Sequence, residues 1–486
     1  MSTSGLTPSD RMSGSASIVT AVARAGGQKQ TTSTIATIPA PTRTGASYAA
    51  GTIGPCRATI THLHSVAMEV IVAELALRGG QPVRTIPFPD SIVHDEREEE
   101  QVLEVVRSGN WGGGIGAKKN AALAELFARQ QDAAYCIPVS SGTAALEVAL
   151  EALGVGPGDE VIVPAYTWIA TPLSALSIGA LAVFADVDRA TFNIDPADIE
   201  RKITPRTRAI VPVHWGGRPC DLDAIIEIGT RHGIPILEDA AQAHGAKWRG
   251  RGVGAIGAAG TFSFQQSKTI TAGEGGAITT NDAAIAERAA SIANCGRIRP
   301  EDTHLTENPL GHNYRLNELS AALLLAQLSR LDELADRRDA NARVLDTELG
   351  SIAGLRTRPR DERIDRSAQY LYLFRYDPTG FGGLSRDEFA RAMQAEGIPC
   401  FAGAGSLVYR SPLLNATPRN TAALLLSDRP IDYRQTRCPE AERLAAEALY
   451  VPHRVLMGTS LDVADVIAAA RKVQAHASEL VPATVR

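Results

Sequence analysis

Short runs rich in β-branched residues alternate with helical patterns from about residue 135 to residue 280, and this alternation limits the possible folds most strongly. Between the first two runs, apolar residues from Leu146 to Leu153 recur at helical spacing, before a glycine and a proline that end the helix. Repeated β-α-β steps of this kind are typical of an α/β protein with a mainly parallel sheet. The seven expected strands are 135–139, 161–164, 181–187, 209–213, 234–238, 260–264 and 277–280.

The length of 486 residues exceeds what one hydrophobic core usually supports, so we expect two domains. A long amphipathic pattern from residue 317 to about residue 341 predicts one connecting helix that leaves the sheet. Beyond it, an alternating segment at 370–376 and a helical segment at 385–396 are typical of a smaller α+β domain. The sequence therefore predicts a large domain over 68–335 and a small C-terminal domain over 336–486.

Residues 1–67 differ from the rest in composition. They are rich in serine, threonine, alanine and glycine, with Asp10 the only acid and Tyr48 the only aromatic residue. Such a segment cannot bury a core, so we expect a disordered extension that the active protein does not need. A transit peptide and a start site placed too far upstream are the alternatives.

Charge and cysteine usage restrict the kind of partner. The net charge is −5 and no basic block occurs, which argues against binding to nucleic acid or to an anionic membrane surface. No apolar stretch approaches the roughly 18 residues of a membrane-spanning helix. Six scattered cysteines, without a C-x-x-C pair or zinc-type spacing, predict reduced thiols in a cytoplasmic protein that holds no metal. A small-molecule partner is the remaining expectation.

Two charged side chains follow neighbouring expected strands. Ligands of an open parallel sheet collect beyond the carboxyl ends of its strands, where Asp239 and Lys268 are expected. Transfer of an amino group needs an amine that forms a Schiff base and a carboxylate that keeps a cofactor ring protonated, and these residues can supply both. Taken singly, Lys268 could be a solvated surface residue and Asp239 could cap a helix.

A possible anion site precedes the first helix of the sheet domain. The sequence SSGTA at 140–144 places small hydroxyl residues at a helix N-terminus, whose free N–H groups can bind a phosphate. An ordinary N-cap is the alternative interpretation. Neither this segment nor the glycine-rich loop at 111–116 has P-loop spacing, and no G-x-G-x-x-G fingerprint follows a strand.

With these residues in place, the sequence from about Met68 to the C-terminus resembles the DegT/DnrJ/EryC1 family of sugar aminotransferases. These are fold-type I enzymes that depend on pyridoxal 5'-phosphate. Five ordered landmarks carry the resemblance: SGTAAL at 141–146, PAYTW at 164–168, EDAAQ at 238–242, FSFQQSK at 262–268 followed by GEGG at 273–276, and GHNYR at 311–315.

The resemblance implies a role for each matching residue. Lys268 would form the Schiff base with pyridoxal 5'-phosphate, and Asp239 would pair with its ring nitrogen. Because members that remove a hydroxyl carry histidine at the lysine position, Lys268 favours transamination. The other implied cofactor-binding residues are Gln242 at the ring hydroxyl, Trp168 on the ring face, Gly142, Thr143 and Ser263 at the phosphate, and Asn313 reaching across from the second subunit of a homodimer.

The Gln265–Gln266 pair resembles the branch that aminates cyclitols or makes 3-amino-5-hydroxybenzoate. In the cyclitol branch, L-glutamine donates the amino group and a keto-cyclitol such as scyllo-inosose accepts it, in aminocyclitol and aminoglycoside antibiotic biosynthesis. A 3-amino-5-hydroxybenzoate synthase, a nucleotide-sugar aminotransferase and a sensor that keeps the fold without turnover are the alternatives. His214, His244 and Tyr409 could line the acceptor site, or could equally be packed in the core.

Overall fold

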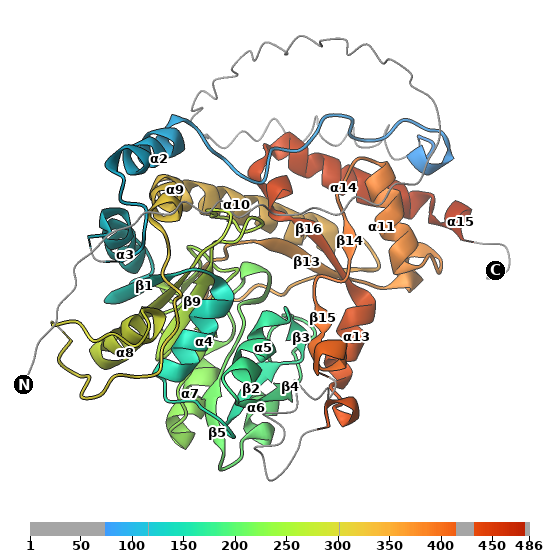
Figure 1. The fold of residues 1–486 in the computed structure, drawn as a ribbon. Coiled ribbons are helices and arrows are strands. Elements are labelled where there is room, and N and C mark those ends of the chain that lie inside the picture. Colours follow the sequence, from blue (N-terminus) through green and yellow to red (C-terminus); the bar gives the residue numbers. More distant parts are fainter. Residues whose placement is uncertain (1–72, 115, 301, 415–431, 482–486) are drawn as a thin grey trace, which may run out of the picture. The chain divides into compact units, whose positions relative to one another are not determined.

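The computed structural model describes residues 73–114, 116–300, 302–414 and 432–481 (Figure 1). The extension predicted at 1–67 lies outside these residues, so it stays a prediction. No helix in the described part of the chain is long and apolar enough to cross a membrane.

A three-stranded sheet and a four-stranded sheet meet along one edge in the described part of the chain. Parallel bridges between Ile210 and Ile236, and between Val213 and Asp239, join them. The resulting order is β4-β2-β5-β6-β9-β10-β1, in which β10 alone runs antiparallel to its neighbours. The prediction of a mainly parallel, seven-stranded sheet is confirmed. The strands are β1 (Tyr135–Val139), β2 (Glu160–Pro164), β4 (Leu181–Ala185), β5 (Thr207–Ile210), β6 (Leu237–Asp239), β9 (Ala259–Ser263) and β10 (Gly276–Thr280).

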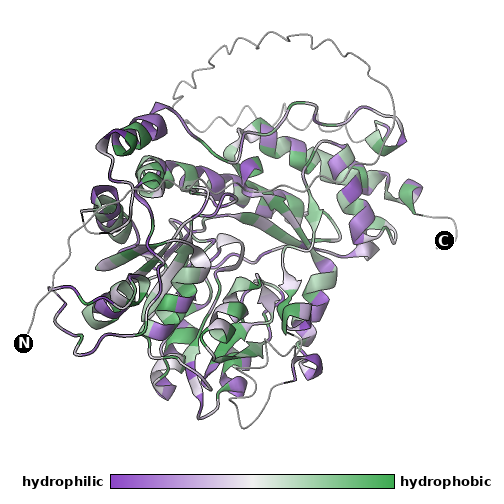
Figure 2. Cartoon of the chain, viewed as in Figure 1, coloured by the Kyte–Doolittle hydropathy of each residue, from purple (hydrophilic) through white to green (hydrophobic). Residues whose placement is uncertain are grey.

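Helices cover both faces of this sheet, because successive side chains of its buried strands point to opposite sides. In β2, Val161 and Val163 pack in one apolar cluster with α4, whereas Ile162 packs in another with α6 and α7. Figure 2 shows the apolar strands between helices with hydrophilic outer surfaces. The helices are α4 (Gly142–Ala152), α5 (Ala170–Ser177), α6 (Pro196–Lys202), α7 (Leu222–His232) and α8 (Ala283–Ala293).

The prediction of one connecting helix at 317–341 is wrong, because two helices occupy this region. They are α9 (Glu318–Leu328) and α10 (Leu331–Gly350). At the break, the Ser329 hydroxyl donates to the carbonyl of Ala326 at 2.7 Å, which satisfies a carbonyl at the end of α9. Arg330, which lies between the two helices, forms ion pairs with Glu98 and Asp95. The apolar spacing continues across the break, so periodicity alone did not reveal it.

A second, antiparallel sheet lies further along the chain, in the order β11-β13-β16-β14. The strand predicted at 370–376 is β13, and the helix predicted at 385–396 is α11, which begins after a capping box of Ser385 and Glu388. Helices α10, α11 and α14 share one apolar cluster with this sheet. The domain limit at residue 336 stays a prediction. The bounds are β11 (Leu355–Thr357), β13 (Leu371–Tyr376), β14 (Phe401–Ala402), β16 (Ala448–Pro452), α11 (Arg386–Ala395), α13 (Pro439–Glu447), α14 (Ser460–Ala475) and α15 (Ala477–Leu480).

Two short strands of the C-terminal part pair with strands of the N-terminal part. The strand β12 (Ile364–Arg366) pairs with β7 (Lys247–Trp248), which in turn pairs with β8 (Arg251–Gly252). The strand β15 (Ser406–Leu407) pairs with β3 (Tyr166–Thr167). Both pairings hold segments far apart in the sequence next to the large sheet.

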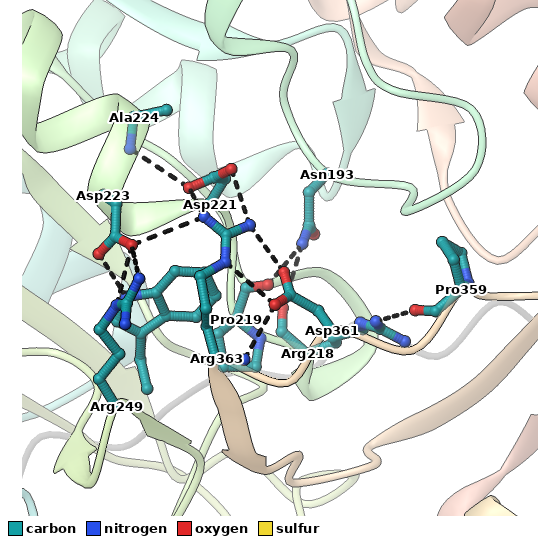
Figure 3. Close-up of polar contacts among 11 residues, drawn as sticks. Asn193, Arg218, Pro219, Asp221, Asp223, Ala224, Arg249, Pro359, Asp361 and Arg363 are labelled. Carbon is teal, nitrogen blue, oxygen red and sulfur yellow. Dashed lines mark hydrogen bonds and ion pairs between the residues drawn. The ribbon is translucent and has the colours of Figure 1, made fainter.

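An ion network fixes the segment that leads into β12 (Figure 3). The guanidinium of Arg363 donates to both carboxylate oxygens of Asp221 at 2.8 and 2.9 Å, and also to Asp361. It lies over the Trp248 ring, 4.6 Å from the centroid. Hydrogen bonds from Arg363 lower the pKa of the Asp361 carboxyl. Because planar bidentate pairs are directional, the network holds this segment against the N-terminus of α7.

The described chain begins with a strap, residues 73–90, that precedes α2 (Glu96–Ser108) and α3 (Lys118–Gln130). The strap contains the short helix η1 (Ala76–Arg78). Its side chains Leu75 and Phe88 are buried in the apolar cluster of the second sheet. The strap is therefore part of the folded core.

We expect a chain that begins at Met68 to keep its melting temperature and its activity, because the composition of residues 1–67 predicts no contribution to a core. A chain that begins at Asp90 is the matched control. It loses the buried side chains of the strap, so its melting temperature should fall clearly. An insoluble or inactive chain from Met68 would contradict the predicted boundary.

Candidate active site

Residues predicted from the sequence gather at one edge of the large sheet, beyond the carboxyl ends of its parallel strands. Asp239 is the last residue of β6 and Ser263 is the last residue of β9. Gly142 begins α4 soon after β1 ends. Since parallel strands end at the same edge, the fold places these residues around a common region.

The Asp239 carboxylate is buried and oriented. The hydroxyl of Thr171, on α5, donates to its Oδ2 at 2.9 Å, and the backbone N–H of Ala241 donates to its Oδ1 at 3.2 Å. Burial raises the pKa of Asp239, while both hydrogen bonds and the charge of Lys268 act in the opposite direction. A carboxylate in this state is stabilised by any additional cation that binds beside it.

The Lys268 side chain lies in the loop between β9 and β10. Its backbone N–H donates to the carbonyl of Gln265 at 2.9 Å, which turns the chain. Burial lowers the pKa of its amine to about 8, although the charge of Asp239 opposes this shift. The amine lies 4.6 Å from the centroid of the Tyr370 ring. At pH 7 such an amine is neutral in about a tenth of molecules, far more often than an ordinary lysine.

A second buried carboxylate, Glu238, directly precedes Asp239 in β6. Glu238 accepts hydrogen bonds from the backbone N–H groups of Gly254, Ile256 and Gly257 at 2.7–2.8 Å. His214 Nε2 lies 3.0 Å from its Oε2. Since His214 Nδ1 accepts from the N–H of Cys220, Nε2 carries the proton and donates. These bonds lower the pKa of Glu238 despite its burial and anchor the end of β6.

The N-terminus of α4 forms a closely packed cradle. The Ser141 side chain caps the helix by accepting from the N–H of Ala144 at 3.1 Å. A Cβ at Gly142 would lie 2.7 Å from the Cβ of Ser263, and a Cβ at Gly276 would lie 2.3 Å from the carbonyl oxygen of Ser141. Only glycine therefore allows these strands to approach the helix end so closely. A helix N-terminus of this kind suits an anion.

The remaining predicted residues are placed differently from one another. Gln242 is buried, and its Oε1 accepts from the N–H of Gly216 at 2.8 Å. Trp168 lies just before α5, and its large side chain is 65% exposed to solvent. Thr143 and Asn313 are also exposed, and the backbone of Asn313 forms a bridge with Asn294.

The sequence did not reveal Thr171 and Tyr370 as neighbours of the two charged residues. Thr171 lies on α5, whereas Asp239 ends the strand β6, and Tyr370 lies more than a hundred residues after Lys268 in the chain. Long-range contacts of this kind cannot be recognised from spacing.

The three residues left open for the acceptor site are packed inside the protein. His214 is fully buried and bonded to Glu238, as described above. Burial lowers the pKa of His244 to about 3, and its ring packs against Phe262 and Phe264. The Tyr409 hydroxyl donates to Glu442 at 2.8 Å. The packed interpretation fits all three residues in this conformation.

Comparison with known proteins agrees with this geometry. Residues 93–471 match the family model described as the DegT/DnrJ/EryC1/StrS aminotransferase family. The chain belongs to this aminotransferase family. The resemblance inferred from the five landmarks is thereby confirmed, and the protein is an aminotransferase.

Two curated relatives and a crystal structure are similar to this aminotransferase over most of its length. The L-glutamine:2-deoxy-scyllo-inosose aminotransferase of Micromonospora echinospora is 39% identical over 422 residues, which cover 84% of this chain and 99% of the relative. The 3-amino-5-hydroxybenzoate synthase of Amycolatopsis mediterranei is 38% identical over 372 residues, covering 76% and 93%. A crystal structure of 3-amino-5-hydroxybenzoic acid synthase is 36% identical, with a TM-score of 0.71 over 82% of this chain and 100% of that chain.

The aminotransferase offers each group that pyridoxal 5'-phosphate requires. Lys268 is half-buried, and its amine has a lowered pKa. Asp239 is a buried carboxylate with a raised pKa, so a cation that binds beside it would stabilise its charge. Gly142 opens a helix N-terminus that suits the phosphate, next to Ser263. The residues on this edge of the sheet therefore fit the cofactor.

Proposed function

We propose that this aminotransferase binds pyridoxal 5'-phosphate between Lys268, Asp239 and the N-terminus of α4. The bound cofactor supplies an aldehyde that accepts amino groups and a ring that accepts electrons. Asp239, oriented by Thr171, keeps the ring nitrogen protonated through its negative charge. Gly142, Thr143 and Ser263 hold the phosphate, Gln242 contacts the ring hydroxyl, and Trp168 covers the ring face.

In this proposal, Lys268 has two tasks. With the cofactor bound, its amine would form the covalent attachment, and as a free amine it would hold and move the proton at the donor carbon. A pKa of about 8 suits both tasks, because the neutral and protonated amine are then both available near neutral pH.

We further propose that L-glutamine donates the amino group and that a keto-cyclitol such as scyllo-inosose accepts it, in aminocyclitol biosynthesis. The observation that carries this proposal is the 39% identity, over nearly the full length of the relative, to an L-glutamine:2-deoxy-scyllo-inosose aminotransferase. Synthesis of 3-amino-5-hydroxybenzoate is the second candidate, because the synthase is 38% identical over a shorter region.

Product analysis with a panel of acceptors tests the assignment. The purified enzyme is supplied with L-glutamine and, separately, with scyllo-inosose, 2-deoxy-scyllo-inosose, aminodehydroshikimate and a nucleotide-linked keto sugar. We expect amino-cyclitol from one of the keto-cyclitols at a kcat/KM at least tenfold above the other acceptors. Formation of 3-amino-5-hydroxybenzoate or of an aminated nucleotide sugar as the main product would refute the cyclitol assignment.

We also propose that the enzyme is a cytoplasmic homodimer in which Asn313 serves the phosphate site of the other subunit. The exposed side chain of Asn313 is free to reach a neighbouring molecule, and the family resemblance gives it that role. In a twofold dimer the same contact occurs twice, once at each site.

Mixing inactive variants tests the shared site. Heterodimers of Asn313→Ala and Lys268→Ala chains should contain one site with both defects and one intact site, so activity should return towards half of the heterodimer's sites. Heterodimers of Lys268→Ala and Asp239→Ala chains are the control, because both residues belong to the same site and no site is intact. Absence of recovery in the first mixture, after verified subunit exchange, would show that Asn313 serves its own chain.

A further inference from the structure

Tyr370 lies against the amine of Lys268, although it belongs to the segment that leads into β13 of the second sheet. The Lys268 Nζ is 4.6 Å from the centroid of the Tyr370 ring. An ammonium group within about 6 Å of an aromatic face is attracted by the negative charge density of the ring. The contact is therefore a cation–π interaction in the conformation where the amine is free.

The Tyr370 ring is held at its hydroxyl end by the loop that carries Lys268. Its hydroxyl oxygen lies 2.9 Å from the Oγ of Ser267. Ser267 Oγ also donates to the side-chain oxygen of Gln265 at 2.8 Å, and the Ser267 N–H donates to the same oxygen. Because the single hydroxyl proton of Ser267 is used for Gln265, Tyr370 donates to Ser267. The residue next to Lys268 thus fixes the ring beside it.

The ring also stacks on His453, with the centroids 6.0 Å apart and the planes at 28°. Burial lowers the pKa of His453 to about 3, so the stacked ring is neutral and does not repel the amine. The backbone of Tyr370 is equally constrained, because a Cβ at Gly217 would lie 2.9 Å from its nitrogen and 2.6 Å from the carbonyl oxygen of Gln242. Tyr370 therefore has a defined place next to the predicted cofactor contacts.

We propose that Tyr370 is a positioning residue that holds the free amine of Lys268 beside the reacting atoms while the amine is not covalently bound. The proposal rests on the proposed function, in which the donor displaces Lys268 and the released amine must then transfer a proton. A long, flexible side chain would otherwise sample many rotamers away from the site. The ring face restricts these rotamers and leaves the amine free to give or take a proton.

Other groups also influence the pKa of the Lys268 amine, and their effects must be distinguished from the effect of Tyr370. The charge of Asp239 favours the protonated amine, and burial disfavours it. His244 also lies within electrostatic reach, but burial keeps it neutral near pH 7. Removing only the aromatic ring should therefore lower the affinity of the amine for its proton, while these other influences stay the same.

Competitive acetylation of Lys268, followed by mass spectrometry across a pH series, measures this effect. It is carried out on the full-length chain without cofactor and on the same chain loaded with pyridoxamine 5'-phosphate, which leaves the lysine free. The variants are Tyr370→Leu, which removes the aromatic ring, and Tyr370→Phe, which keeps it and loses only the hydroxyl. Other lysines in the same sample serve as internal controls.

We expect the wild-type midpoint near the pKa of about 8. In Tyr370→Leu the acid dissociation constant of Lys268 should rise about five- to thirtyfold, the range of a desolvated cation–π contact, whereas Tyr370→Phe should stay near the wild type. Turnover of Tyr370→Leu should fall in kcat with little change in KM for the donor. A wild-type midpoint in Tyr370→Leu, or an equal shift in both variants, would overturn the proposal.

Two controls keep the result interpretable. If Tyr370→Leu does not fold, Tyr370→Met is the second variant, because it also removes the ring that lies 4.6 Å from the Lys268 amine. It should shift the midpoint in the same direction, and an unchanged midpoint in Tyr370→Met would overturn the proposal. The acetylation needs no turnover. A shifted midpoint in a chain that transaminates no ketone would refute the proposed function while supporting the contact between Tyr370 and Lys268.

Discussion

Replacing Lys268 with alanine is expected to reduce turnover by several orders of magnitude, because the change removes both the covalent attachment and the proton carrier. In the wild-type enzyme, borohydride should remove the absorbance band of the lysine-bound cofactor and leave the reduced cofactor attached to Lys268, as detected by peptide mass spectrometry. The variant should show neither the band nor the label.

A matched control is Lys202→Ala. Lys202 ends α6 on the way to β5, at the opposite edge of the sheet from Asp239 and Lys268. Its replacement should leave kcat and the cofactor band unchanged. Normal turnover of the Lys268→Ala variant would refute the proposed chemistry.

The second large effect concerns stability, and it arises from a buried ion pair beneath the N-terminal strap. The Lys472 amine lies 2.9 Å from Glu396 Oε2, with both side chains 1% exposed. Glu396 also accepts from the backbone N–H groups of Ala76 and Val83, at 2.9 and 3.0 Å. Lys472 donates to the carbonyl of Gln81 at 2.8 Å. The pair thus joins the strap to α11 and α14.

Lys472→Met keeps most of the side-chain volume but leaves the Glu396 carboxylate buried without its cation. Breaking a buried pair in this way costs about 3 kcal/mol or more of unfolding free energy. Denaturant unfolding should therefore show a large loss of stability. Arg337→Ala is the control, because it breaks an exposed pair with Glu333 and should cost less than about 0.5 kcal/mol. Equal, small losses in both variants would contradict the proposed role of the strap.

The sequence predicted the parts of the fold that depend on local patterns. Each expected run of the large sheet became a strand within a few residues, because buried parallel strands are short, apolar and bounded by turns. Asp239 was recognised because it ends a strand, and the ends of parallel strands meet at one edge of a sheet. Ser263 was named by the family resemblance, and the structure places it at the end of β9. Strand ends and one helix start therefore carried the part of the site that was predicted from local patterns, and the family resemblance supplied the other residues.

Features that depend on long-range contacts could not be predicted in this way. The break between α9 and α10 coincides with the ion pairs that Arg330 forms with α2, far away in the sequence. The contact between Lys268 and Tyr370 depends on the path of the chain from β12 to β13. The pairing of β12 with β7 and the ion pairs of Arg363 hold the start of that path. Neither the Arg330 ion pairs nor the contact between Tyr370 and Lys268 produces a recognisable spacing or periodicity in the sequence.

The most direct test of the proposed transamination is a single-turnover mixing experiment with the purified enzyme. L-Glutamine alone, without any ketone, should abolish the absorbance band of the lysine-bound cofactor as the amino group passes to the cofactor. A later addition of scyllo-inosose should restore the band and release an equal amount of amino-cyclitol. A band that glutamine leaves unchanged, or that no keto-cyclitol restores, would contradict the proposed reaction.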